Sequence, residues 1–282
     1  IMPSLVGSEM CIRDREIIGP FFKEMLDTVI LTSATLTVGG DFSFILDRLG
    51  LVESESLLLL RLPPTFDYGS QVSLIVPSFF PGPGEDGWEE HTSLMAGLLT
   101  EVLLPLKRGT LVLFTSFDML GRVYDAVRFA YERERVPLFA QGMSGSRELL
   151  TSLFREHKES TLLGVSSFWE GVDVPGEALE ILVIAKLPFP VPGEPVYEAR
   201  LERLERRGVS SFTSYAVPLA VIRLRQGFGR LIRRRKDRGI VLLLDPRIVK
   251  MWYGKIFTDS LPVDVREVSS MDELMREVIG WF

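Results

Sequence analysis

Residues 222–247, IRLRQGFGRLIRRRKDRGIVLLLDPR, join a glutamine and two arginines at helical spacing to an apolar run that ends in a carboxylate. Gln226, Arg230 and Arg233 are four and three residues apart, so a helix would place one amide and two guanidiniums on one face. Guanidiniums bind phosphate in a bidentate manner, and a transferring γ-phosphoryl group needs such charge stabilisation. The alternative is a basic helix end that contacts only solvent. The strand-like run ending at Asp245 favours the phosphate interpretation.

The charge of this segment differs from the charge of the whole chain. The 282 residues carry a formal net charge of −6, whereas residues 223–238 contain eight Arg or Lys and one Asp. Binding to a polyanion would therefore depend on a local patch. The hydrophobic fraction of 46% is sufficient for a core. No run reaches the roughly 18 apolar residues of a membrane span, so we expect no membrane partner, and the single cysteine indicates a reducing cytoplasm.

The cysteine and histidine content limits the possible sites. Cys11 is the single cysteine, so the chain can hold neither an internal disulfide nor a cysteine-ligated iron–sulfur cluster. His91 and His157 lack the spacing of metal ligands, and we expect no metal site. Residues 1–15 lack periodicity and resemble translated sequencing-adaptor sequence. We expect this segment to be non-native and the natural protein to extend further upstream.

The rest of the chain alternates between strand-like and helix-like segments. Apolar, β-rich runs predict strands at 28–31, 57–60, 72–76, 110–114, 137–140, 161–165, 179–185 and 239–244. Helical spacing predicts helices at 41–49, 89–106, 119–134, 146–157, 195–207, 212–224 and 271–281. This alternation predicts an α/β fold with a doubly wound, mainly parallel sheet and helices on both faces.

Polar residues directly follow four of the predicted strands. These residues are Thr115-Ser116, Ser166-Ser167, Lys186 and Asp245, in chain order. In an open parallel sheet, ligands bind beyond the carboxyl ends of the strands. One polar cluster at a strand end is ordinary, whereas four predict a binding edge.

Over most of residues 28–282, ordered segments resemble the C-terminal motor region of superfamily 2 helicases of the DinG/XPD type. LTSATL at 31–36 looks like motif III, and LVLFTS at 111–116 looks like motif IV. SSFWEGVDVPG at 166–176 looks like motif V, and its WEGVD string points to this branch rather than to DEAD-box enzymes. Residues 226–233 look like motif VI. The resemblance implies a RecA-like fold.

The resemblance also implies roles in nucleotide binding. Arg233 would be the arginine finger, Arg230 would be a second phosphate contact, and Gln226 would link the nucleotide to the domain interface. Gly171 would permit a tight turn that brings Asp173 toward the ATP ribose or a phosphate-bound water. Four further cations lie next to Arg233, and they are Arg234, Arg235, Lys236 and Arg238. These side chains are more simply explained as a solvent-exposed patch, and secondarily as contacts to a nucleic-acid backbone.

The remaining motif residues are expected to bind nucleic acid or to couple the two sites. The expected nucleic-acid contacts are Thr115, Ser116, Ser166, Ser167 and Trp169. Hydroxyl contacts to phosphate would position a strand without reading its sequence. Ser116 also fits a helix cap, and burial is an alternative for Trp169. Ser33 and Thr35 would couple a phosphate-bound state to the neighbouring domain, although a helix N-cap turn is an alternative for motif III.

The domain prediction assigns residues 16–55 to the tail of a first motor domain, containing motif III. Residues 56–282 are assigned to a second motor domain, containing motifs IV, V and VI. The chain has neither a phosphate loop nor an Asp-Glu-x-His box. In the resembled family both belong to the first motor domain, with the Mg²⁺ ligands and any iron–sulfur domain also upstream. We therefore expect this chain to be inactive alone.

The implied activity is that of an ATP-dependent DNA helicase working in DNA repair, with ATP and Mg²⁺ as cofactors. Its expected partners are its own N-terminal motor domain and single-stranded DNA or a forked duplex. The alternatives are a nucleic-acid-binding module without ATPase activity and an RNA-directed helicase of the same superfamily.

Overall fold

A computed structural model describes residues 14–52, 56–82, 87–169, 178–191 and 193–282, which group into two compact units. The larger unit comprises the described residues of 64–188 and 223–282, and the smaller unit comprises the described residues of 14–63 and 189–222. Within the described part of the chain, no helix is long and apolar enough to cross a membrane.

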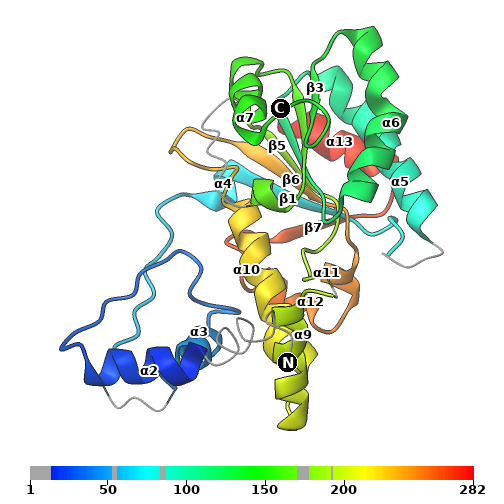
Figure 1. Ribbon diagram of the computed structural model, residues 1–282. Helices are drawn as coiled ribbons and strands as arrows, with labels where there is room; N and C mark the ends of the chain where they lie inside the picture. The colour runs from blue at the N-terminus through cyan, green and yellow to red at the C-terminus, as the bar shows by residue number, and fades with distance from the viewer. Residues whose placement is uncertain (1–13, 53–55, 83–86, 170–177, 192) are drawn as a thin grey trace. The chain divides into compact units, whose positions relative to one another are not determined.

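The larger unit is built on a seven-stranded sheet with the order β3-β4-β2-β5-β6-β1-β7, in which all neighbours are parallel (Figure 1). The strands are β1 (Val72–Pro77), β2 (Thr110–Leu113), β3 (Leu138–Ala140), β4 (Thr161–Gly164), β5 (Ile181–Ile184), β6 (Gly239–Leu243) and β7 (Val265–Val268). The sheet confirms the predicted doubly wound, mainly parallel α/β fold. The sequence reasoning missed β7, because this edge strand has two exposed charged residues at its centre, Arg266 and Glu267.

Helices cover both faces of this sheet, as predicted (Figure 1). One face packs against α5 (Trp88–Gly97), α6 (Phe117–Glu134) and α13 (Met271–Trp281) in the main hydrophobic core. The helix α5 continues as the π-helical turn η2 (Leu98–Leu103) and the 3₁₀ turn η3 (Leu104–Leu106). The other face carries α7 (Arg147–Glu156), α8 (Ser166–Trp169) and the last turns of α10 (Val217–Phe228). Parallel neighbours require crossover connections, and these carry the helices over the faces of the sheet.

Three short helices complete the larger unit: α4 (Tyr68–Gln71), α11 (Arg247–Lys250) and α12 (Gly254–Thr258). The smaller unit contains α2 (Asp14–Glu24), α3 (Ser43–Leu49), α9 (Pro195–Arg206), η5 (Phe212–Ala216) and the first turns of α10. Its core is formed around the stacked rings of Tyr197 and Tyr215. The Tyr215 hydroxyl accepts a hydrogen bond from Arg200 Nη1 at 2.7 Å.

Two predicted strands in the smaller unit, at 28–31 and 57–60, are wrong. Both segments are irregular and strongly exposed, with Ile30 at 84% and Leu58 at 91% exposure. Among the described residues, neither segment has a neighbouring strand. A β-strand needs such a neighbour to satisfy its backbone groups, so apolar β-rich sequence alone does not produce one.

Candidate nucleotide and nucleic-acid site

Four strands of the larger unit end at the same level. Leu113 of β2 aligns with Gly164 of β4 and with Ile184 of β5, which in turn aligns with Leu243 of β6. The ladder continues one residue further, because Phe114 N–H donates to Gly164 O at 2.8 Å. The four polar clusters that the sequence placed after these strands therefore lie along one carboxyl edge.

Motif V begins in a tight turn between β4 and α8. A Cβ atom at Gly164 would lie 2.7 Å from Phe168 Cβ, so only glycine allows this close approach. The turn brings Trp169 back toward β2, where its Nε1–H donates to Phe114 O at 3.1 Å. The tryptophan is only 4% exposed. Its ring therefore offers no face for base stacking, and the expected nucleic-acid contact of Trp169 is replaced by a structural role.

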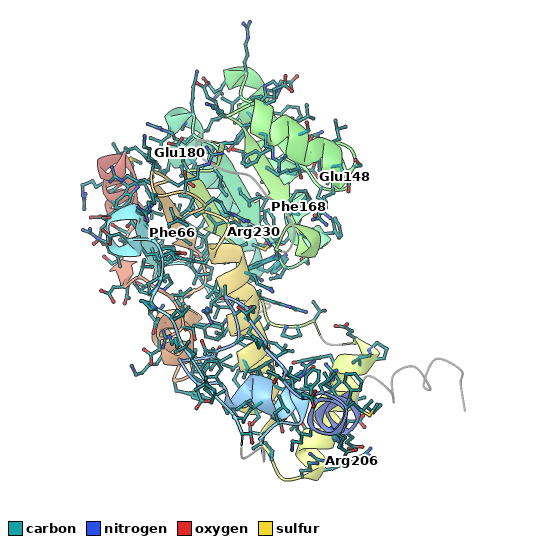
Figure 2. The ribbon with its side chains drawn as sticks, turned by 90° about the vertical axis from the view of Figure 1, so that its left-hand side faces the viewer. Phe66, Glu148, Phe168, Glu180, Arg206 and Arg230 are labelled. Carbon is teal, nitrogen blue, oxygen red and sulfur yellow. The ribbon has the colours of Figure 1, made fainter. Side chains whose placement is uncertain are left out.

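The same tryptophan packs against motif VI. A Cβ atom at Gly227 in α10 would lie 2.9 Å from Trp169 Cε3 and Cζ3, so the indole ring rests on a bare patch of helix. Arg230 Nη2 donates to Trp169 O at 2.9 Å. Figure 2 shows Arg230 where α10 ends, beside the strands. Trp169, itself part of motif V, thus contacts Phe114 of motif IV and two residues of motif VI. The sequence reasoning did not identify this contact, for which Gly227 was the available signal.

We predict that Gly227→Ala lowers the free energy of unfolding by about 1–2 kcal/mol, because the overlap with the Trp169 ring outweighs the gain in helix propensity. Urea denaturation measures this difference. The matched control is Gly97→Ala, in the last turn of α5, where an added Cβ meets nothing within 4 Å. Equal stability of the two variants would show that the contact with Trp169 is loose.

Motif VI departs from the predicted geometry. The helix α10 ends at Phe228, and Arg230 lies in the following turn, with its N–H donating to Gly227 O at 3.0 Å. The prediction that Gln226, Arg230 and Arg233 share one helix face is therefore wrong. Glycines at 227 and 229 lower the helix propensity at this point by about 1 kcal/mol each relative to alanine.

A separate loop presents the last arginine of the motif. The carboxylate of Asp237 accepts the N–H of Arg233 at 2.9 Å and the N–H of Arg234 at 2.8 Å. The Arg233 side chain is exposed, as are the side chains of Arg234, Arg235, Lys236 and Arg238. Gln226 is half-buried, and its Oε1 is buried without a hydrogen-bond donor among the described residues. An unsatisfied buried acceptor costs about 1–3 kcal/mol, so Gln226 is suited to accept a hydrogen bond from another molecule or domain.

The hydroxyl groups predicted to contact nucleic acid have different environments. Thr115 is half-buried directly beyond β2. Ser116 is the N-cap of α6 and accepts a hydrogen bond from Met119 N–H at 3.3 Å, which confirms the helix-cap alternative for this residue. Ser166 and Ser167 form the start of α8, but their side chains lie outside the described part of the structure, as do Gly171 and Asp173.

Motif III lies in the smaller unit and forms a local turn. Ser33 Oγ accepts a hydrogen bond from Thr35 N–H at 3.1 Å and lies 3.2 Å from Thr35 Oγ1. The turn is exposed or half-buried and precedes α3. Asp41, which lies just before the N-cap residue Phe42, accepts the N–H of Ser43, the first residue of α3.

Asp245, directly beyond β6, is a structural carboxylate. The sequence predicted its place at the carboxyl edge of the sheet but not its role. Asp245 is fully buried, and its Oδ2 accepts the Leu187 N–H at 2.8 Å. Arg247 donates to the carboxylate through its own backbone N–H at 3.1 Å, through Nε at 2.9 Å and through Nη2 at 2.7 Å. The carboxylate thereby ties the ends of β5 and β6 to α11. Among the described residues, no group of three or more His, Cys, Asp or Glu side chains is arranged to hold a metal ion.

Comparisons with known proteins agree with this fold. The helicase C-terminal domain family matches residues 99–264. A Bacillus subtilis protein named 3'-5' exonuclease DinG is 34% identical over 266 residues, which cover 94% of this chain and 28% of that protein. The ATP-dependent DNA helicase YoaA of Haemophilus influenzae is 40% identical over 239 residues, which cover 83% of this chain and 35% of that protein.

A solved structure named XPD_Helicase superposes with a TM-score of 0.50 at 18% identity, covering 70% of this chain and 35% of that one, and therefore supports the fold alone. The chain spans roughly a third of the length of these curated relatives, at 28% and 35%. These matches confirm the resemblance to DinG and XPD proteins that the motifs suggested. Because the family match covers more than half of its residues, the chain belongs to the helicase C-terminal domain family.

Proposed function

We propose that this chain is the C-terminal motor part of an ATP-dependent DNA helicase that couples ATP hydrolysis to movement along single-stranded DNA and to duplex unwinding. The observation that carries the proposal is the contact of Trp169 with Phe114, Gly227 and Arg230, because it joins the expected nucleic-acid edge to the expected nucleotide-sensing segment. Relatives named ATP-dependent DNA helicase support it. We further propose that the protein works in the cytoplasm, in DNA repair.

On the nucleotide side, the exposed guanidinium of Arg233 would contact the γ-phosphate of ATP held by another domain. Arg230 would be the second phosphate contact, and Gln226 would accept a hydrogen bond at the domain interface. Gly171 and Asp173 would complete the site. We propose that a first motor domain, with a phosphate loop and the Mg²⁺ ligands, supplies the bound ATP, so that residues 16–55 are its tail and 56–282 are the second motor domain.

On the nucleic-acid side, Thr115, Ser166 and Ser167 would donate hydroxyl hydrogen bonds to phosphates of a single strand. Such contacts hold a backbone without selecting a sequence, as a translocating enzyme requires. A displacement of Arg230 by the nucleotide would reach Thr115 through Trp169, since Trp169 bonds to the residue that precedes Thr115. Ser33 and Thr35 would couple the phosphate-bound state to the first motor domain.

The test uses the full-length protein that contains this chain, with residues 1–282 alone as a comparison. We expect the full-length protein to hydrolyse ATP faster in the presence of single-stranded DNA and to unwind a tailed duplex, while residues 1–282 alone do neither. Nucleic-acid binding without stimulated hydrolysis would identify a binding module. Stimulation by RNA but not by DNA would identify an RNA-directed helicase. Either result overturns the proposal.

A further inference from the structure

Lys186 lies on the carboxyl edge between motif IV and the buried Asp245. Ala185 N–H donates to Leu113 O at 3.0 Å, and Leu244 N–H donates to Ile184 O at 2.9 Å, so the ladders of β5 continue beyond its last residue. Thr115, Lys186 and Asp245 each follow directly on the last residue of these ladders, so the three residues lie at the same level of the carboxyl edge. Adjacent strands are about 4.8 Å apart, which makes Thr115 and Lys186 neighbours on this edge.

The ammonium group of Lys186 is held in place by an aromatic ring. Its Nζ lies 3.6 Å from the centroid of the Trp88 ring, at the start of α5, in a cation–π contact. The residue as a whole is only 8% exposed. A lysine held in this way has lost most of its rotamer freedom before any ligand arrives, and the entropic cost of binding is correspondingly lower.

Among the described residues, none of the charged neighbours of Lys186 accepts a hydrogen bond from its ammonium group. Asp245 is the nearest anion, but its carboxylate is occupied by Leu187 N–H and by three donors of Arg247. His91 of α5 places its Nε2 3.0 Å from Leu244 O, and burial lowers its pKa, which favours the neutral ring and leaves it without a charge to act on Lys186.

The electrostatic state of Lys186 agrees with this geometry. Burial lowers its pKa to about 8, Asp245 opposes this shift, and Arg247 adds to it. An ammonium group with three donors and no acceptor is poorly solvated, and an anion brought next to it regains the lost interaction. Anion binding would also raise the pKa of Lys186 toward its ordinary value.

We propose that Lys186 binds a backbone phosphate of the nucleic-acid strand next to the contact made by Thr115. This inference rests on the proposed function and adds the positive charge that the hydroxyl contacts lack. Hydroxyls donate hydrogen bonds but do not neutralise a phosphate, whereas a lysine does so as a point charge. The pre-positioned ammonium group, which lies beside Thr115 and has no hydrogen-bond acceptor among the described residues, meets this need at the edge of the sheet.

The experiment measures binding of a fluorescent oligothymidylate to the full-length protein over a series of salt concentrations. Each phosphate contact contributes about 0.7 to the slope of log K against log salt for a single strand. We expect Lys186→Met to lower the slope by about this amount and Lys186→Arg to retain it. The control Lys255→Met removes an exposed lysine of α12 that pairs with Asp259, and it should leave the slope unchanged.

A second measurement follows affinity from pH 7 to pH 9. Because the free ammonium group loses its proton near pH 8, wild-type affinity should fall through this range more steeply than that of Lys186→Met. Urea midpoints confirm that the variants are folded, and Lys186→Gln provides a second neutral variant. If both neutral variants leave the salt slope and the pH profile unchanged, the inference about Lys186 is overturned, while the proposed function is not affected. A full-length protein that binds no single strand overturns the proposed function as well.

Discussion

Replacement of Arg233 by alanine in the full-length protein is expected to lower the rate of DNA-stimulated ATP hydrolysis by about 10³–10⁵-fold, the range that arginine fingers supply in other phosphoryl-transfer enzymes. The side chain is exposed on a loop whose backbone is fixed by Asp237. Its exposure allows a nucleotide bound by another domain to reach the guanidinium. Its contribution should be made in the transition state, so kcat should fall while KM for ATP changes little.

Two further variants make this result specific. Arg235→Ala removes the same charge from the same exposed loop and should retain most of the activity. Arg233→Lys keeps the charge but lacks the planar fork, so it should restore little of the rate. Strong DNA-stimulated hydrolysis that survives Arg233→Ala would exclude this residue as the finger. A loss of equal size in Arg235→Ala would indicate a general effect of charge instead.

Replacement of Asp245 by alanine is expected to lower the free energy of unfolding by about 3 kcal/mol, near the lower end of the range for a broken buried ion pair. The lower end applies because the Arg247 side chain is 29% exposed, while the Asp245 side chain is fully buried. The loss has two parts: the arginine keeps an uncompensated charge, and the Leu187 N–H loses its acceptor. Urea denaturation of the chain measures the difference.

Asp259→Ala is the matched control, because it removes a partly exposed carboxylate that pairs with Lys255 four residues earlier on α12. Exposed pairs of this kind contribute about 0.3–0.5 kcal/mol. Asp245→Asn should fall between the two, because it keeps one oxygen acceptor but loses the charge. A loss below about 1 kcal/mol in Asp245→Ala, within the range of an ordinary hydrogen bond, would contradict the structural role assigned to this carboxylate.

The sequence was sufficient to predict the central sheet because its buried strands are continuous apolar runs. Leu111–Leu113 and Ile181–Ile184 have no other stable place than a core covered on both faces. The runs at 28–31 and 57–60 have the same local character, but their pairing depends on neighbours at a distance. Periodicity cannot supply that information, and it also failed for the charged edge strand β7.

The candidate site, too, could be predicted only in part from the sequence. The ordered motifs predicted which residues gather at the carboxyl edge, since parallel strands end there together. Burial of Trp169 was one of the two alternatives, but the motifs did not predict the end of α10 at Phe228 or the packing of the Trp169 ring on Gly227. Both depend on close packing around Gly227, and a one-dimensional pattern does not contain the distance between a helix backbone and an indole ring.

The contact between Gly227 and Trp169 also constrains how these sequences change over time. A side chain at position 227 needs space that the indole ring now occupies, so a larger residue there becomes tolerable only after a smaller ring appears at position 169. Neither change is neutral by itself, because the first creates a clash and the second leaves a cavity next to Phe114. The two positions are therefore expected to covary across related proteins, while Arg234, Arg235, Lys236 and Arg238 drift independently.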